Sequence, residues 1–511
     1  MGDSLFKSGA PVPRDYQRAI AAKALERNTL VVLPTGLGKT LIAALVLQDS
    51  LKRGERVVVL APTKPLAEQH MKTLLEIMEL EQEEITLITG GTVAEKRTVL
   101  WENARVALAT PQTLENDLKR KRMRLDGVGL VVFDEAHRCV GKYAYSHIAG
   151  ECKKKGVRIL GLTASPGSNE QKIRKIMETL GIEAVEVRGE EDEDVRGYMQ
   201  PRSTRWVEVD LPPSIISLRL EMEGIITEKA TMFERLGLLG RTRALSKKKL
   251  MAIRKMIDNA SGGWKYSALS RYAELFNLVH AHELLETQGI GTFLEFFKRM
   301  EGRKTKSKAV QRILNDKRVL GLIERAKDIQ TEHPKLIKLV EIIGELQGKT
   351  IIVFVQYRDQ VMRVADALGK LDGIRPVKFV GKGKGVSQKD QKRTIEHFRN
   401  GDYNVLVATQ IGEEGLDIPS VDCVIFYEPV PSEIRSIQRR GRTGRTRAGE
   451  VVVLITRGTR DETYYWVSRR KEKRMKNIIN RMQKTPVKRR GRNIQAVGKD
   501  KKQQMSIVDY V

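Results

Sequence analysis

Short apolar runs rich in β-branched residues recur through the first third of the chain and alternate with stretches of helical spacing. The runs are LVVLP (30–34), RVVVLAP (56–62), RVALATP (105–111), LVVFDEAH (130–137) and RILGLTAS (158–165). A strand that is buried on both faces reads as a continuous apolar run, and such strands occur in parallel sheets covered by helices. The pattern therefore predicts a parallel α/β sheet with crossover helices.

The same pattern returns after a long interruption. The second set of runs comprises KTIIVFVQY (349–357), VKFVG (377–381), NVLVATQ (404–410), CVIFYEP (423–429) and GEVVVLIT (449–456). Between the two sets, residues 213–330 are rich in Leu, Lys, Arg, Glu and Ala at helical spacing and have no comparable strand run. We therefore expect two parallel-sheet α/β domains with an all-helical domain inserted between them.

Breaks in these patterns give the domain boundaries. Pro212 and Pro213 mark the entrance of the helical segment, and Pro334 precedes a new helix that leads into the second sheet. After about residue 470 the chain becomes a basic, Gln-rich stretch with few core residues, and we expect residues 485–511 to be largely disordered. The predicted segments are a first domain at 1–212, a helical insert at 213–333, a second domain at 334–470 and a basic tail or linker at 471–511.

Positive charge is concentrated outside the apolar runs. The chain carries a formal net charge of +28, and a field of that sign attracts polyanions. Residues 224–333 contain 22 Lys and Arg against 12 Asp and Glu, and residues 468–503 contain 15 against 2. The two basic segments indicate nucleic acid as the partner, because a merely solvated charged surface, the alternative, would mix the two signs more evenly.

Other features narrow the class of protein. No apolar run approaches the roughly 18 residues needed to span a bilayer, and residues 1–13 lack the basic start and apolar core of a secretory signal. We expect no membrane association and an intracellular location, in the cytoplasm or nucleoid. The three cysteines are too few and too widely spaced for a disulfide framework or a zinc cluster. We interpret His280 and His282 as helix residues rather than metal ligands.

LPTGLGKT (33–40) directly follows the first apolar run and opens a helix, which is the context of a phosphate-binding loop. Glycines let backbone amides turn toward phosphates, the lysine meets the β and γ oxygens of ATP, and the last threonine can ligate Mg²⁺. Leu33 stands where the general motif has its first Gly. The predicted ATP-binding residues of this loop are Pro34, Thr35, Gly36, Leu37, Gly38, Lys39 and Thr40.

VVFDEAH (131–137) places an acidic pair at the end of a buried strand. Burial of charge there would be costly without a cation beside it, so the pair indicates a metal site. We expect Asp134 to hold Mg²⁺ directly or through water, and Glu135 to orient and deprotonate the attacking water.

QRRGRTGR (438–445) packs four arginines and two glycines into eight positions, a dense donor array suited to phosphate. Such a run can also be a nucleic-acid or solvated basic patch. Because it follows the fourth strand of the second sheet, we favour a finger supplied to the γ-phosphate of ATP across a domain interface. Our candidates in this run are Arg442 and Arg445, with Gln438 as a further catalytic residue. Closure and reopening of the cleft during hydrolysis would then drive movement along a bound strand.

These motifs, taken in order, resemble the full series of superfamily 2 helicases. The series is RDYQ (14–17), LPTGLGKT, APTKPLAEQ (61–69), TPQT (110–113), DEAH (134–137), TAS (163–165), IIVFVQYRD (351–359), VLVATQIGEEGLDIP (405–419) and QRRGRTGR. The resemblance covers about 1–210 and 335–465, and it implies that both sheet domains are RecA-like.

The resemblance also implies roles for single residues. Arg14 and Gln17 would recognise adenine, and Gly415 and Asp417 would lie at the nucleotide cleft between the domains. Two further groups complete the expectation: His137, Thr163 and Ser165 would couple hydrolysis to strand movement, and the tracked strand would be contacted by Thr63, Thr110 and Thr409.

A helical insert between the two domains is similar to that of the archaeal Hef helicase-nuclease and its Fanconi-anaemia M relatives, and also to that of RIG-I-like and Dicer helicases. We judge Hef the nearest match, which implies action on forked or branched DNA. Hef continues into an XPF-like nuclease, and the present sequence has no GDxxxERK-like motif. Any nuclease domain would therefore lie C-terminal to this chain or reside elsewhere.

The insert and the tail carry further candidates. The basic clusters RTRALSKKK (241–249) and KRMEGRKTKSK (298–308) can contact backbone phosphates without reading sequence. For Trp264 and Tyr266 we favour core packing over stacking on an exposed base. QMSIVDYV (504–511) partly resembles a sliding-clamp docking peptide, with Gln504, Ile507 and Tyr510 at the expected spacing and Val511 in place of the second aromatic. The candidate nucleic-acid contacts in the first cluster are Arg241, Arg243, Lys247, Lys248 and Lys249.

The sequence thus predicts an ATP-dependent DNA helicase or translocase for forked or branched DNA in replication-fork repair and recombination, with ATP and Mg²⁺ as cofactors. Two alternatives stay open. One keeps the ATPase and assigns double-stranded RNA as the ligand, as in the RIG-I and Dicer type. The other is a nucleic-acid scaffold without turnover.

Overall fold

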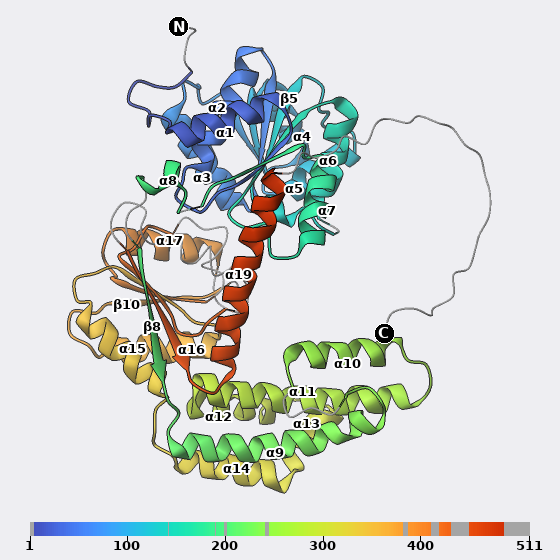
Figure 1. Cartoon of the computed structure of the whole chain (residues 1–511), viewed down its shortest axis with the longest axis vertical. Helices are drawn as coiled ribbons and strands as arrows, with labels where there is room; N and C mark the ends of the chain where they lie inside the picture. The colour runs from blue at the N-terminus through green and yellow to red at the C-terminus, as the bar shows by residue number, and fades with distance from the viewer. Residues whose placement is uncertain are drawn as a thin grey trace.

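A computed structural model of the chain describes residues 5–141, 143–189, 191–198, 202–240, 245–381, 387–409, 418–430 and 449–484. Two parallel sheets lie one above the other in Figure 1, and a bundle of helices extends sideways from the lower one. The expected arrangement of two parallel-sheet α/β domains with an all-helical insert is confirmed. None of the helices in the described ranges is both long and apolar enough to cross a membrane.

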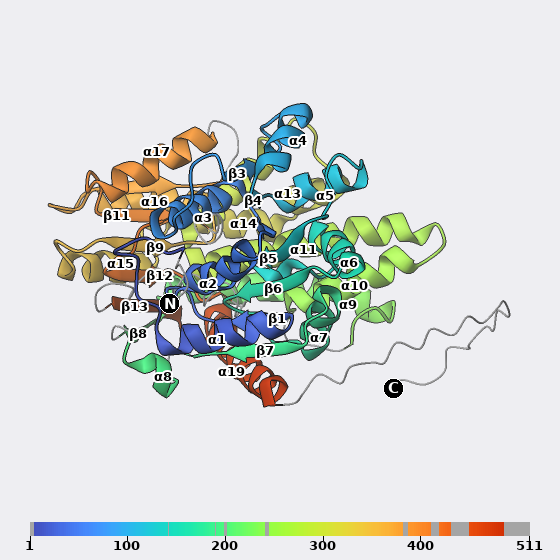
Figure 2. The ribbon, with the colours of Figure 1, turned by 90° about the horizontal axis from the view of Figure 1, so that it is seen from above.

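The first sheet has seven parallel strands. Their order is β3 (Ile85–Ile88), β4 (Val106–Ala109), β2 (Arg56–Leu60), β5 (Val128–Phe133), β6 (Arg158–Thr163), β1 (Thr29–Val32) and β7 (Ala184–Val187). One face packs against α1 (Asp15–Glu26), α2 (Lys39–Lys52) and α3 (Lys64–Ile77). The other face packs against α4 (Ala94–Asn103), α5 (Pro111–Lys119), α6 (Ala144–Lys155) and α7 (Glu170–Leu180). Figure 2 shows these two layers from above.

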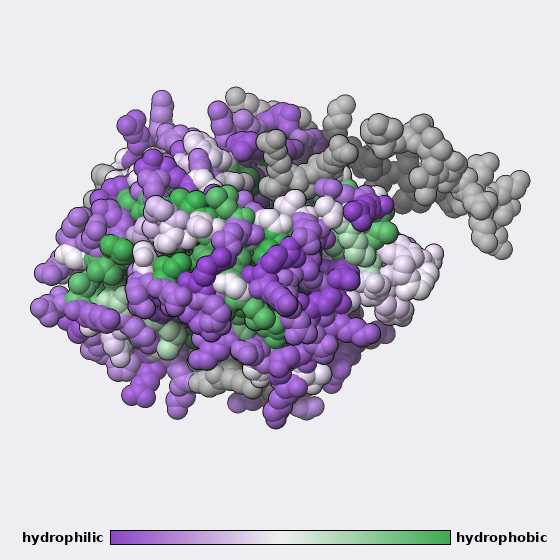
Figure 3. Space-filling model, turned by 90° about the horizontal axis from the view of Figure 1, so that it is seen from below, coloured by the Kyte–Doolittle hydropathy of each residue, from purple (hydrophilic) through white to green (hydrophobic). Residues whose placement is uncertain are grey.

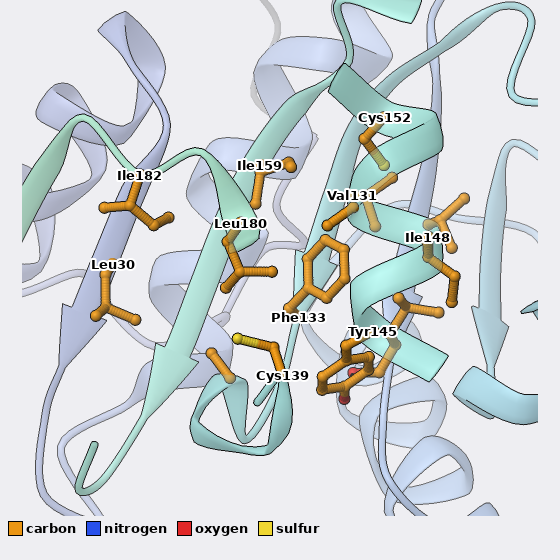
Figure 4. Close-up of a cluster of buried hydrophobic side chains, with 14 of the residues drawn as sticks. Leu30, Val131, Phe133, Cys139, Tyr145, Ile148, Cys152, Ile159, Leu180 and Ile182 are labelled. Carbon is orange, nitrogen blue, oxygen red and sulfur yellow. The ribbon is translucent and has the colours of Figure 1, made fainter. Parts of the chain in front are cut away.

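The core beneath α6 and α7 is a cluster of buried hydrophobic side chains. Figure 4 shows Phe133 of β5 and Tyr145 and Ile148 of α6 meeting over the sheet. Cys139 and Cys152 lie in the same cluster, and burial raises the pKa of each thiol to about 12. At neutral pH these cysteines are therefore neutral packing groups.

The described part of the second sheet has six parallel strands. Their order is β10 (Pro376–Phe379), β11 (Val405–Ala408), β9 (Ile351–Phe354), β12 (Cys423–Phe426), β13 (Gly449–Thr456) and β8 (Arg202–Val209). Helices α15 (Pro334–Glu345) and α16 (Arg358–Leu368) cover one face, and α17 (Gln388–Arg399) covers the other.

Strand β8 corrects the predicted end of the first domain. Residues 202–209 fall within the segment 1–212 assigned to that domain, yet they pair with β13 along their whole length at the edge of the second sheet. Most residues of this edge strand are at least partly exposed, so its sequence lacks the continuous apolar run that marked the other strands. The remaining boundaries stay predictions.

Within its described residues, 213–240 and 245–333, the insert is a bundle of six helices. They are α9 (Pro213–Arg235), α10 (Lys247–Asn259), α11 (Trp264–Gln288), α12 (Ile290–Glu301), α13 (Lys308–Asn315) and α14 (Lys317–Asp328). All six contribute to one apolar core. Seen from below in the orientation of Figure 1, the surface of the molecule is mostly hydrophilic, with hydrophobic patches between the hydrophilic side chains (Figure 3).

A single long helix, α19 (Arg460–Lys484), runs from the second sheet to the first (Figure 1). It packs against β13 and α11 near its start and along β7 farther on. Four apolar side chains enter the core of the first domain: Met475, Ile478, Ile479 and Met482. The prediction of a tail or linker from residue 471 is therefore wrong for residues 471–484. Their spacing of i, i+3, i+4 and i+7 is helical, but the surrounding basic residues dominate the composition. Residues 485–511 lie outside the described residues.

Candidate functional site

The loop LPTGLGKT joins β1 to α2 at the carboxyl edge of the first sheet. Gly36 and Gly38 adopt φ angles of 91° and 78°, in the left-handed region that favours glycine. A Cβ atom on Gly38 would also collide with the amide of Gln17. Leu33 and Leu37 are buried and anchor the loop to the core. The loop is thus folded around its backbone, as a phosphate cradle requires.

Arg14 and Gln17, the predicted adenine-recognition residues, lie against this loop. The Gln17 amide accepts a hydrogen bond from the Arg14 backbone N–H (2.9 Å) and donates one to the Leu37 carbonyl (3.1 Å). The Arg14 guanidinium lies 4.7 Å from the ring centroid of Tyr198, just after α8 (Glu193–Arg196). Sequence reasoning missed Tyr198, because it lies far along the chain from Arg14 and has no motif around it. Its half-exposed ring offers a flat surface beside the loop for a base.

Lys39 begins α2 and turns its amine back over the loop. Its Nζ donates to the carbonyl oxygen of Leu33 at 2.9 Å and to that of Pro34 at 3.4 Å. A hydrogen bond between two charged groups is stronger than one to a neutral carbonyl. The phosphate oxygens of ATP would therefore displace these carbonyls from the ammonium group.

Asp134 follows β5 and is buried. Its Oδ2 lies 3.0 Å from Nε2 of His70 in α3. Burial acts to raise the pKa of Asp134, but the hydrogen bond and charge of His70, with the charge of Lys39, outweigh it and hold the pKa below its ordinary value. The carboxylate is thus ionised at neutral pH. Sequence reasoning missed His70, which lies one residue beyond APTKPLAEQ.

Glu135 has a left-handed backbone, with φ 49° and ψ 48°. This conformation costs a non-glycine residue about 1–2 kcal/mol, and such strain concentrates at functional sites. Among the described residues, its buried Oε2 has no hydrogen-bond partner, although Nδ1 of His137 lies 3.2 Å away. A buried carboxylate with an unused acceptor oxygen suits the predicted role of a base toward water.

A chain of contacts leads from this carboxylate to α19, the helix that joins the two sheets. Nδ1 of His137 lies 3.0 Å from Oγ1 of Thr163, which accepts a hydrogen bond from the Ser165 backbone N–H (3.1 Å). The Ser165 hydroxyl contacts the sulfur of Met475 in α19 at 2.9 Å. The three residues predicted to couple hydrolysis to movement therefore touch one another and reach the helix that joins the two sheets.

The residues around this loop fit a magnesium ion. Mg²⁺ prefers hard oxygen ligands and is held by one or two carboxylates together with substrate phosphates. Asp134 supplies an ionised, buried carboxylate beside Lys39, and Thr40 supplies a hydroxyl at the first turn of α2. Thr40 and Asp134 therefore remain the candidate ligands.

Two of the three predicted strand-contacting threonines lie side by side. Thr63 and Thr110 are the N-caps of α3 and α5, which follow the neighbouring strands β2 and β4. Helix amino ends present unpaired N–H groups that favour phosphate. Thr409 follows β11 in the other sheet. Across the boundary between the sheets, Lys392 of α17 forms an ion pair with Glu68 of α3 at 2.6 Å.

The basic cluster of the insert is divided between two roles. Lys247 forms an ion pair with the buried Glu283 at 2.7 Å, so it belongs to the joint between the insert and α19. Lys248 and Lys249 are exposed at the start of α10. Trp264 and Tyr266, in the first turn of α11, are 42% and 79% exposed, so the favoured core packing is wrong for both. They follow the turn between α10 and α11, where few neighbours can cover them (Figure 1).

Other candidates fall outside the described residues. These are the predicted finger residues, the predicted cleft residues, two insert arginines and the clamp-like peptide: Gln438, Arg442, Arg445, Gly415, Asp417, Arg241, Arg243 and 504–511. Their roles stay predictions.

The sequence matches three protein families in succession. Residues 14–173 match the DEAD/DEAH box helicase family, residues 334–447 match the helicase conserved C-terminal domain, and residues 217–333 match the helical bundle of a family described as ATP-dependent RNA helicase.

Curated relatives align along most of the chain. A Methanocaldococcus jannaschii protein named as an ATP-dependent RNA helicase is 40% identical over 487 residues, which cover 94% of this chain and 62% of that protein. The ATP-dependent DNA helicase mph1 of Neurospora crassa is 36% identical over 484 residues, 88% of this chain and 41% of its own length. The chain thus spans about two fifths to three fifths of these relatives.

A solved structure covers the same extent. The Hef helicase domain of Pyrococcus furiosus has 44% sequence identity and a TM-score of 0.69, over 89% of this chain and 98% of that one. At this identity and coverage, the likeness extends to both sheets and the insert.

Proposed function

Because this chain belongs to the superfamily 2 DEAD/DEAH-box helicases, in the group of the Hef helicase domain, we propose that it is an ATP-dependent DNA helicase or translocase that acts on forked or branched DNA. The observation that carries this proposal is the buried Glu135 carboxylate beside the phosphate loop, whose Oε2 accepts no hydrogen bond among the described residues and lies 3.2 Å from Nδ1 of His137. An ionised Asp134, an ammonium at Lys39 and an open acceptor together suit hydrolysis of a phosphoanhydride.

In the proposed reaction, Lys39 leaves its two carbonyl partners and binds the β and γ oxygens of ATP. Glu135 accepts a proton from the water that attacks the γ-phosphorus. Mg²⁺, when bound by Thr40 and Asp134, supplies positive charge that offsets the charge of the phosphates. Arg14 and Gln17 position the base, and the ring of Tyr198 lies where it can cover it.

Movement follows from completing the site across two domains. Arg442 and Arg445, with Gln438, are proposed to reach the γ-phosphate from the second domain, beside Gly415 and Asp417. Loss of the γ-phosphate removes the group that both halves hold, so the cleft reopens. The contacts from His137 through Thr163 and Ser165 to α19 offer a route by which this change reaches the second domain.

Branched DNA is the proposed substrate because the helical insert adds a second surface for nucleic acid beside the two sheet domains. Thr63, Thr110 and Thr409 would hold one strand, while exposed groups of the insert meet another arm of the branch. Lys248 and Lys249 present charge for phosphates, and the exposed Tyr266 can stack on an unpaired base. The mph1 relative is named as a DNA helicase.

The test compares ATP hydrolysis stimulated by forked DNA, linear duplex DNA and double-stranded RNA at equal nucleotide concentration. We expect the forked DNA to stimulate most, and equal stimulation by linear duplex would contradict a branch preference. Tyr266→Ala should reduce the preference for the fork while leaving hydrolysis without nucleic acid unchanged.

A second candidate is an RNA-dependent ATPase, because the Methanocaldococcus relative and the family matched by the insert are both named for RNA helicases. Greater stimulation by double-stranded RNA would favour it. An absence of turnover with every nucleic acid would leave the scaffold interpretation.

A further inference from the structure

Helix α19 carries a basic stripe on the side turned away from the cores. Arg470, Lys473, Arg474, Asn477 and Arg481 recur at intervals of three and four residues, so they share one face of the helix. Together with Ile478 of the same helix and Glu170 of α7, these side chains line an open groove of about 630 Å³. We refer to this groove as the α19 groove.

The α19 groove is strongly positive. Glu472 is the sole acidic residue among residues 463–484, against eight Lys and Arg. Glu170, the carboxylate in the groove, already forms ion pairs with Arg481 at 2.7 Å and Arg174 at 2.8 Å. Lys473 and Arg474 remain exposed. The groove therefore holds more positive charge than its own carboxylate neutralises.

The opposite face of α19 fixes the groove to both domains. Met475 is buried in the first domain and touches Ser165. At the other end, Arg460 forms ion pairs with Glu283 at 3.1 Å and Glu286 at 3.6 Å in the insert. A ligand held in the groove would therefore be held at a defined position relative to both domains and the insert.

We propose that the α19 groove binds the phosphodiester backbone of a DNA arm, which makes α19 a phosphate-binding element outside the helicase motifs. This inference rests on the proposed function. From Arg470 to Arg481 the helix rises about 16 Å, a length that matches roughly five phosphates of one duplex strand. The guanidinium groups suit phosphate geometry.

An acidic protein segment is the competing occupant. Stable docking of a peptide on a helix face needs apolar anchors at its centre, and Ile478 is the single apolar side chain lining the described groove. A row of cations with little apolar surface fits a regular array of phosphates better. The groove would therefore recognise the charge and spacing of the phosphates rather than the base sequence.

The test uses the full chain with Arg470, Lys473 and Arg474 all changed to Gln. Binding of a labelled forked DNA is measured by fluorescence anisotropy over a range of salt concentrations. Each lost phosphate contact lowers the slope of log affinity against log salt by about 0.9, so we expect a slope shallower by about 2 to 3. The single change Lys473→Gln should lower the slope by about 0.9.

The matched control changes Lys338, Lys349 and Lys370 to Gln. These lysines lie on and after α15 and α16, toward the amino ends of β9 and β10, and their replacement removes the same charge. We expect the control slope to stay near that of the unaltered protein, with ATP hydrolysis in the absence of DNA unchanged in both variants. A triple variant with a slope as steep as the control's would overturn the groove assignment alone. Failure of the unaltered protein to bind or respond to DNA would overturn the proposed function as well.

Discussion

Lys39 and Lys335 are two lysines in opposite situations. Lys335 is fully buried, its Nζ lies 2.8 Å from Oδ2 of Asp461, and it faces the ring of Tyr427 at 4.8 Å. Oδ2 of Asp461 also accepts a hydrogen bond from the Thr456 backbone N–H. Lys39 is partly exposed and rests on two loop carbonyls. One lysine is matched by a carboxylate, and the other is held by groups that a phosphate can replace.

The carboxylates show the same contrast. Asp461 is occupied by its lysine at the start of α19, whereas Glu135 keeps a buried oxygen without a hydrogen-bond partner among the described residues. Burial of charge alone therefore does not identify a site. The paired charges of Lys335 and Asp461 hold elements together, whereas the strained Glu135 lies beside the phosphate loop, where we propose that it acts on a ligand.

The largest expected effect is on turnover. Lys39→Ala removes the cation at the γ-phosphate, and we expect ATP hydrolysis to fall by about 100-fold to 1000-fold or more, the cost of removing a preorganised donor from developing negative charge. DNA binding and the midpoint of thermal unfolding should change little, because the hydrogen bonds of Lys39 Nζ to the Leu33 and Pro34 carbonyls lie within its own loop. Steady-state phosphate release and thermal unfolding measure the two outcomes. Retained turnover would refute the assignment of the nucleotide site.

Lys335→Ala should do the reverse. It leaves Asp461 buried and unpaired, which costs about 3–5 kcal/mol, and we expect the loss in urea denaturation rather than in the chemistry of a folded site. The double change Lys335→Met with Asp461→Leu removes both charges and should recover most of the stability. A double variant as unstable as the single one would show that the pair does more than balance charge.

The sequence revealed the parts of the fold that local pattern controls. LVVFDEAH became β5 with Asp134 and Glu135 at its end, and LPTGLGKT became the loop between β1 and α2. In both places a doubly buried strand leaves a continuous apolar run, and the chemistry follows directly in the chain. Such sites can be predicted from the sequence because the strand, the turn and the functional side chain are neighbours along the chain.

Other parts depend on contacts between distant residues. His70 meets Asp134 only because α3 packs on the sheet that contains β5, and Tyr198 meets Arg14 only in the folded chain. The four apolar residues of α19 were hidden among basic ones, and β8 is an edge strand without an apolar run. Single-sequence periodicity carries no signal for such pairings.

Asp316, the N-cap of α14, is a second carboxylate that is paired with cationic side chains of the protein. Burial acts to raise its pKa, but hydrogen bonds from Arg318 and Lys229 lower the pKa of Asp316 to about 2. The folded pKa lies below the unfolded one, so its contribution is present above about pH 4 and is lost as the pH falls toward 2. Asp316→Asn should cost about 2 kcal/mol at pH 7 and almost nothing at pH 2.

Urea denaturation at the two pH values checks this, with turnover at pH 7 as the second readout. Asp134→Asn is the matched variant, because its pKa is also lowered but its proposed partner is a ligand. We expect Asp316→Asn to keep turnover and Asp134→Asn to lose it. Equal loss of turnover in the two variants would contradict the distinction between Asp316, which is paired within the protein, and Asp134, which we propose binds a ligand.

The ion pair between Lys392 and Glu68 gives the smallest effect. Its length of 2.6 Å is close to the 2.8 Å of Lys335 and Asp461, and it also joins distant elements, but its side chains are 45% and 33% exposed. Exposed pairs contribute about 0–1 kcal/mol, so Lys392→Gln should change stability by less than about 1 kcal/mol. Near 1 M salt, where screening acts within about 3 Å, the difference should vanish. Urea denaturation at low and high salt checks this, and a cost near that of Lys335→Ala would mean that distance, rather than burial, sets the strength of the pairs that join these domains.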